Sequence, residues 1–238
     1  RYVLRFEGRG TIEVTGRARN IRYGQNEVRF DYAPGPGSVD IRIQRINSSD
    51  PPRNITVMRE AHVAAYDAGA VFNPDLLAHL RGVKLLRFMD WMMTNDSPIA
   101  TWEDRPRVSD VTYALRGVPL PVMLALANEL QADPWFNMPH LADGDHMRNF
   151  AQAVKAGLDP ALTAHVEFSN EVWNWQFAQT RWADEQAEAR WGEAEKGMQF
   201  YGMRAGEMAQ IWEEVFGHTA KGRLTRVISS QTGWLGLE

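Results

Sequence analysis

The residues with the clearest chemical meaning are Ser169, Asn170 and Glu171, which open the run Ser-Asn-Glu-Val-Trp-Asn. The stretch before them, 165–168, alternates like a strand, which predicts that Glu171 lies where a strand ends. In parallel α/β proteins, functional side chains gather at the carboxyl ends of strands. A carboxylic acid there can protonate the oxygen of a glycosidic bond, while a second carboxylate acts as nucleophile or activates water. Glu171 is therefore the candidate catalytic acid/base.

Three further side chains follow predicted strands and are candidates for binding substrate beside Glu171. Asn170 is suited to hydrogen-bond a sugar hydroxyl, and Arg87 or His140 could hold neighbouring carboxylates in orientation. Each has an ordinary structural alternative: an ion pair for Arg87, a hydrogen-bonded surface position for His140, and for Glu171 a favourable place at a helix N-terminus. The site hypothesis therefore requires the strands to lie side by side.

Tryptophan is unusually frequent, with nine residues in the chain. Flat aromatic faces stack on sugar rings, but they equally fill protein cores. Because they lie close to predicted strand ends, Trp91, Trp173 and Trp234 are the candidates for substrate contact. Trp182 and Trp191 lie in helical sequence and are expected to pack.

The elements that would position these residues begin after a different kind of segment. Residues 1–50 predict a small antiparallel β domain, because apolar and polar residues alternate between Gly, Asn and Pro turns. Its expected strands are 2–6, 10–14, 27–30 and 39–43. A run rich in Asn, Ser, Asp and Pro at 47–52 reads as a linker, since these residues favour turns and extended chain.

Residues 51–238 show short β runs that alternate with helical periodicity, which predicts βαβ units and a parallel sheet. The β runs are 54–58, 84–88, 135–137, 165–168 and 224–228, and the clearest helices are 120–130, 144–156 and 198–215. A (β/α)8 barrel has eight strands and uses about 250 residues. The expected fold class is therefore α/β: a partial (β/α)8 TIM-type barrel of about five strands, apparently incomplete, preceded by the small β domain.

Composition argues against several classes of function. With 26 basic and 30 acidic residues, the formal charge of −4 predicts no broad cationic surface for nucleic acid. No run approaches the roughly 20 apolar residues that span a membrane. Zero cysteines exclude disulfides and thiol chemistry. Asp143, Asp145 and His146 are better explained by the start of a helix than by a metal site, so we expect neither metal nor cofactor.

The strand and its end, 165–174, resemble the fourth-strand signature of the large clan of retaining glycoside hydrolases built on (β/α)8 barrels, in which an Asn-Glu pair ends that strand. The resemblance implies that Glu171 is the acid/base and that Asn170 binds the sugar's 2-hydroxyl. Arg87 is similar to the arginine that such enzymes place near the nucleophile, and His140 matches a third-strand polar residue more loosely.

The chain departs from the clan at the second carboxylate. The clan's nucleophile is a glutamate that ends the seventh strand, and neither Asp90 nor Glu238 occupies that position. The function expected from the resemblance is cleavage of β-linked oligo- or polysaccharide with acid/base assistance, but the nucleophile is unassigned. An incomplete enzyme, completion by another chain or different chemistry would each account for this.

Two alternative functions stay open. A non-catalytic carbohydrate-binding protein would keep the aromatic surface and need no second acid. An esterase would use a serine such as Ser229 or Ser230, although no G-x-S-x-G motif supports it. The unpaired edges of an incomplete barrel favour a homo-oligomer. Localisation is open, and the substrate class alone favours a secreted or periplasmic protein.

Overall fold

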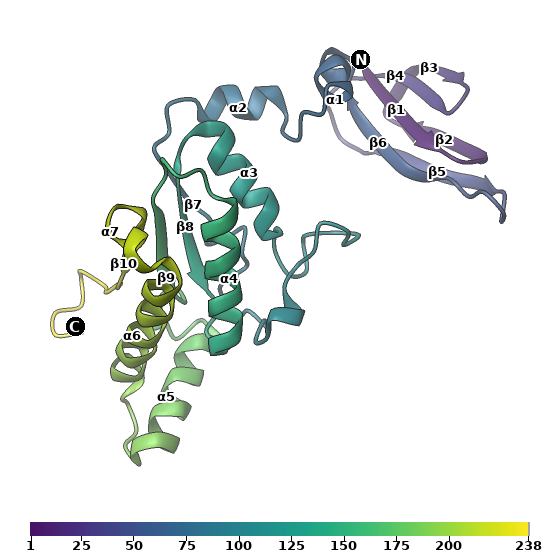
Figure 1. Ribbon diagram of the computed structural model, residues 1–238. Coiled ribbons are helices and arrows are strands. Elements are labelled where there is room, and N and C mark those ends of the chain that lie inside the picture. Colours follow the sequence, from purple (N-terminus) through teal and green to yellow (C-terminus); the bar gives the residue numbers. More distant parts are fainter. Residues whose placement is uncertain (238) are drawn as a thin grey trace. The chain divides into compact units, whose positions relative to one another are not determined.

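The computed structural model describes residues 1–237, and Glu238 lies outside the described residues. The chain forms two compact units, Arg1–His79 and Leu80–Glu238. Together they make a mixed α/β protein with antiparallel sheets in the first unit and a parallel four-stranded sheet in the second (Figure 1).

The first unit contains two antiparallel sheets. One has the strand order β3-β4-β1-β6 and the other pairs β2 with β5. The strands are β1 (Tyr2–Glu7), β2 (Gly10–Gly16), β3 (Ala18–Gly24), β4 (Glu27–Tyr32), β5 (Val39–Ile46) and β6 (Arg53–Arg59). Alternation buries every second residue, so Ile12 and Val14 of β2 join Leu4, Val28 and Phe30 of the larger sheet in one core. The antiparallel β prediction is confirmed, and its four expected strands correspond to β1, β2, β4 and β5, whereas β3 was not predicted.

The strand at 54–58 lies in this first unit and not in the parallel sheet, so its expected place at the start of the barrel is wrong. It forms β6, which pairs antiparallel with β1 and sets Val57 opposite Leu4. A short apolar run has the same periodicity in either sheet, and only the partner strand distinguishes them. The first unit continues through η1 (Glu60–His62), α1 (Val63–Asp67) and all but the last residue of α2 (Pro74–Leu80), so the compact units divide after His79 and not near residue 50.

The second unit is built on a parallel sheet whose spatial order, β7-β8-β9-β10, follows the chain. Its strands are β7 (Leu85–Arg87), β8 (Asp133–Met138), β9 (Ala164–Phe168) and β10 (Leu224–Val227). These four predicted strands are confirmed, and the described residues contain no fifth strand in this sheet. Because neighbouring strands run the same way, their carboxyl ends meet at one edge, as the site hypothesis requires.

Helices alternate with these strands, and local signals set their ends. The elements are η2 (Trp102–Asp104), α3 (Leu120–Leu130), α4 (Gly144–Gly157), α5 (Ala178–Trp191), α6 (Gly197–Phe216), η3 (Gly217–Thr219) and α7 (Ala220–Arg223). Asp143 caps α4 by accepting a hydrogen bond from the His146 amide at 2.6 Å. Gln131, in a left-handed conformation, ends α3, and Gly217 ends α6. The three helices expected from periodicity are confirmed.

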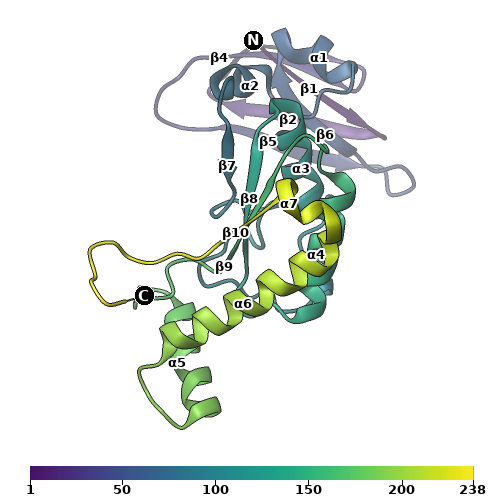
Figure 2. The ribbon, with the colours of Figure 1, turned by 60° about the vertical axis from the view of Figure 1, so that its left-hand side comes forward.

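The helices α3, α4 and α6 cover the same face of the parallel sheet (Figure 2). Phe136 of β8 packs edge-on against Phe150 of α4, and Phe168 of β9 contacts Tyr201 of α6. Since side chains alternate along a strand, the residues between them point to the opposite face. That face carries Arg87, Trp135, Asn137, His165 and Glu167. It is the polar side of the sheet, and the candidate site begins there.

Candidate functional site

The centre of the site is a buried carboxylate, Glu167 of β9, whose residue is only 1% exposed. It accepts four hydrogen bonds: at Oε2 from Arg87 Nη2 (2.9 Å), Trp135 Nε1 (2.9 Å) and Asn137 Nδ2 (2.7 Å), and at Oε1 from Ser229 Oγ (2.6 Å). A buried carboxylate is costly unless its charge is paired and its oxygens accept hydrogen bonds. Both conditions are met here, by residues from β7, β8 and the segment after β10.

Arg87 connects this carboxylate to the candidate site residue Asn170. Its Nη2 lies 2.9 Å from Glu167 Oε2 and also 2.9 Å from Asn170 Oδ1. The guanidinium also stacks over the Trp135 ring, 5.0 Å from its centroid. Asn170, which is 5% exposed, donates from Nδ2 to Asn95 Oδ1 at 3.0 Å. The orientation of the Asn170 amide is therefore held from both sides.

The backbone turns sharply on either side of Asn170. Ser169 and Glu171 have φ angles of 57° and 40°, in the left-handed region that costs a non-glycine residue about 1–2 kcal/mol. Such conformations persist where surrounding contacts hold them. The main contact comes from Gln179 of α5, whose Nε2 donates to Asn170 O and Asn95 Oδ1, both at 2.8 Å. As a result, Asn170 faces the Arg87 network while Glu171 lines a separate open cleft.

Replacing Gln179 with Leu is expected to destabilise the second unit by about 2 kcal/mol, because the buried Asn170 carbonyl loses the hydrogen bond that Gln179 donates to it. Gln179 is fully buried and also accepts from the Asp96 amide at 3.1 Å. Urea denaturation followed by tryptophan fluorescence measures this unit alone, since all nine tryptophans lie between residues 91 and 234. Gln186→Leu, at an exposed position of the same helix, is the control and should change stability little.

Glu171 lies in an open cleft of about 510 Å³, here named the Glu171 cleft. Its lining residues are Glu171, Trp173, Asn174, Trp175, Gln176, Gln231 and Trp234. Asn174 Nδ2 donates to Glu171 Oε2 at 2.8 Å. Trp175 and Trp234 are 57% and 50% exposed, so about half of the surface of each residue is open to a ligand. Among the described residues that line the cleft, Glu171 is the only carboxylate.

The structure thus brings together Glu171, Trp173 and Trp234 in the cleft, and it joins Asn170 to Arg87 by a hydrogen bond. The other two candidates lie elsewhere. Trp91 packs on Phe88, with 5.5 Å between ring centroids, and does not line the cleft. His140 is only 3% exposed and meets the Trp182 ring edge-on at 5.3 Å. We therefore assign the aromatic surface of the cleft to Trp173, Trp175 and Trp234.

His140 is expected to make stability depend on pH. Burial lowers its pKa from 6.5 to about 4, against the opposing charge of Asp96. Between these values the unfolded chain binds the proton and the folded chain does not, so this contribution to stability is complete above about pH 6.5 and is lost as the pH falls towards 4. The loss between about pH 7 and pH 4.5 amounts to about 2–3 kcal/mol.

The variant His140→Leu has no group that binds a proton at this position. Its free energy of unfolding, measured by urea denaturation, should therefore fall by about 2–3 kcal/mol less than that of wild type between about pH 7 and pH 4.5. His218→Leu changes an exposed histidine of the same unit and serves as the control. An equal fall in stability for wild type and His140→Leu between the two pH values would contradict the assignment.

Sequence reasoning missed the residue at the centre of the network. Strand periodicity alone accounts for Glu167 only as part of a strand, yet a charged residue between Val166 and Phe168 in an apolar run is itself a signal, because buried acids are rare unless paired. The sequence pattern does not mark its partners Trp135 and Asn137 as site residues either. Ser229, considered as an esterase nucleophile, donates its hydroxyl to Glu167 and has no hydrogen bond to a histidine within the described residues.

The described residues contain no group of three or more His, Cys, Asp or Glu side chains placed to hold a metal ion. No helix in residues 1–237 is both long enough and apolar enough to cross a membrane. Comparisons of the chain with protein-family models, with curated proteins and with solved structures find no match.

Proposed function

We propose that this chain carries the acid/base part of a glycoside hydrolase site that acts on β-linked oligo- or polysaccharide, with Glu171 as the proton donor. The observation that carries the proposal is the hydrogen-bonded group Arg87, Glu167 and Asn170, which holds the Asn170-Glu171 turn at the carboxyl end of β9 beside the Glu171 cleft. Active sites of parallel barrels occupy this edge of the sheet.

The strand order supports a barrel as the parent fold. In doubly wound sheets the order reverses at a switch point and helices cover both faces. Here β7 to β10 follow the chain, and α3, α4 and α6 lie against one face. We propose that these strands are part of a (β/α)8 barrel whose interior is the face bearing Arg87, Asn137 and Glu167.

In the proposed reaction a sugar ring stacks on the exposed faces of Trp175 and Trp234, which places the glycosidic oxygen at Glu171. Glu171 gives its proton to that oxygen as the bond breaks. Asn174 holds the Glu171 carboxyl from one side, and the Arg87 network keeps the backbone turn in place. Hydrolysis also requires a second carboxylate, which no described residue of the cleft supplies.

This lack of a second carboxylate favours one other function, carbohydrate binding without cleavage. The same aromatic cleft would then hold a glycan, and Glu171 would only accept hydrogen bonds from sugar hydroxyls. Stacking and hydrogen bonding suffice for binding, whereas turnover needs the acid.

One experiment separates the two functions. Wild type and Glu171→Gln are incubated with soluble β-linked polysaccharides, and new reducing ends and affinity are measured in parallel. A glycosidase releases reducing ends only with Glu171 intact, and the variant still binds. If the chain is a binding protein, neither wild type nor Glu171→Gln releases reducing ends, and both migrate more slowly in affinity electrophoresis. Absence of both signals across the polysaccharides contradicts the proposal.

A further inference from the structure

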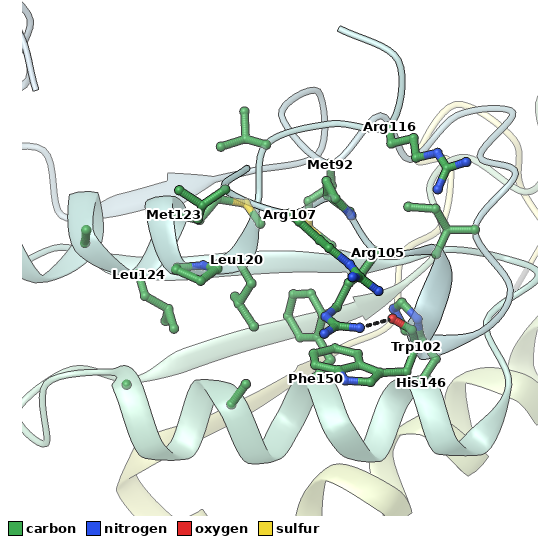
Figure 3. A pocket seen from close by; sticks show the side chains of 18 of the residues that line it. Met92, Trp102, Arg105, Arg107, Arg116, Leu120, Met123, Leu124, His146 and Phe150 are labelled. Atoms are coloured by element: carbon green, nitrogen blue, oxygen red, sulfur yellow. Dashed lines mark hydrogen bonds between the residues drawn. The ribbon is translucent and has the colours of Figure 1, made fainter. Parts of the chain in front are cut away.

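A second cavity in the Leu80–Glu238 unit has a chemistry quite different from that of the Glu171 cleft. It encloses about 660 Å³ beside α3, α4 and the long segment between β7 and α3 (Figure 3). That volume is typical of a site for a small organic molecule. It shares no lining residue with the Glu171 cleft, so it does not belong to the proposed hydrolytic site.

The wall of this cavity is apolar. Among the residues that form it are Met92, Ile99, Leu120, Met123, Leu124 and Phe150. A sugar would leave its hydroxyls unpaired against such a surface, which is unfavourable, whereas a hydrocarbon chain or ring would be removed from water. The wall therefore suits an apolar ligand body.

The mouth of the cavity is positively charged. Every charged residue in the lining is an arginine, namely Arg105, Arg107 and Arg116, and no carboxylate lines the cavity in the described part of the chain. Figure 3 shows Arg105 and Arg107 close to one another above Trp102. None of the three guanidiniums forms an ion pair with a described carboxylate, and the Arg107 side chain has no hydrogen-bond partner among residues 1–237.

The segment that carries these arginines is held in place without a ligand. Arg105 stacks on Trp102 with its guanidinium carbon 4.2 Å from the ring centroid and donates to Trp102 O at 2.6 Å. Val118 N donates to Trp91 O at 2.7 Å and closes the segment at its far end. Burial lowers the pKa of His146, which also lines the cavity, so the arginines supply its positive charge at neutral pH.

We propose that this cavity binds a small amphipathic anion, a hydrocarbon chain or ring that carries one carboxylate or a similar acidic group. The apolar body lies against α3 and α4, and the acid pairs with Arg107 and Arg116 at the mouth. An arginine without a carboxylate partner beside an apolar cavity is the feature that selects an anion over a neutral or cationic amphiphile.

Titration of the full chain with sodium decanoate by calorimetry, below the micellar concentration, tests the proposal. We expect one saturable site, and at least about tenfold weaker binding of decyltrimethylammonium, which has the same chain and the opposite charge. The double variant Arg107→Gln/Arg116→Gln should weaken decanoate about tenfold, since charge-assisted hydrogen bonds are lost. Arg190→Gln, at an exposed position of α5 outside the lining, should leave the affinity unchanged.

A cavity-filling variant tests the position of the chain. Ala153 lies on the α4 side of the lining, and Ala153→Phe should abolish decanoate binding while far-ultraviolet circular dichroism stays like wild type. Should that variant not fold, the arginine variants on the exposed segment carry the test. Equal affinity for decanoate and the cationic amphiphile, or decanoate binding unchanged in the double variant, overturns the proposal.

Discussion

Glu171→Gln is expected to lower kcat/KM for β-glycosides with alkyl leaving groups by about 10²–10⁴-fold, the usual worth of a positioned general acid. Gln is close to Glu in shape and keeps the hydrogen bond with Asn174, but it has no proton to give to the departing oxygen. For a dinitrophenyl glycoside the loss in kcat/KM should be below about tenfold, because that leaving group departs without protonation. Affinity for the intact glycan should change little.

The dependence on the leaving group is the informative part of this measurement. If Glu171 had a purely structural role, the substitution would lower kcat/KM for both glycosides by the same factor. Glu188→Gln, an exposed change on α5, is the matched control and should leave both rate constants as in wild type. Equal losses for the alkyl and dinitrophenyl glycosides would count against the acid/base assignment.

Glu167→Gln is expected to lower the free energy of unfolding of the second unit by about 3 kcal/mol, or its Tm by about 6–12 °C. The substitution removes the charge that pairs with Arg87 and turns one carboxylate oxygen into a donor that faces other donors. The Arg87 side chain is 36% exposed, so water can hydrate it in the variant. The expected loss of stability is therefore at the lower end of the range for breaking a buried ion pair. Tryptophan fluorescence during thermal unfolding measures this change in Tm.

The same variant should also reduce hydrolysis, because Arg87 would no longer be held against Asn170 and the turn before Glu171 would loosen. In this case kcat/KM falls for alkyl and dinitrophenyl glycosides together, unlike the pattern expected for Glu171→Gln. Glu188→Gln, at an exposed position of α5, is the control for stability. A Tm within about 2 °C of wild type would show that the four hydrogen bonds to Glu167 contribute little.

Local signals in the sequence were sufficient for most of the second unit. The stripe of Met147, Phe150 and Val154 predicts α4, and all three side chains are buried. Short apolar runs predict β7, β8, β9 and β10, although they could not show that 54–58 joins β1 instead. Periodicity reports which face of an element is buried, and it carries no information about which other strand will pair with it.

The same local signals predict only part of the candidate site. Glu171 and Asn170 stand out because they are adjacent residues at a strand end, and Arg87 because it ends another strand. His140 and Trp91 have the same sequence context, yet they pack against Trp182 and Phe88. Strand-end position places a residue near the functional edge, but the direction of its side chain depends on the turn that follows.

The sequence by itself determined the four strands and the main helices of the second unit and the position of Ser169-Asn170-Glu171 at a strand end, because alternation, capping and strand-end chemistry act over a few residues. The tertiary structure alone decided what surrounds that turn. Glu167 gains its donors from Arg87, Asn137 and Ser229, which are 80, 30 and 62 residues away along the chain. Such contacts form only when the sheet has assembled, so no local pattern encodes them.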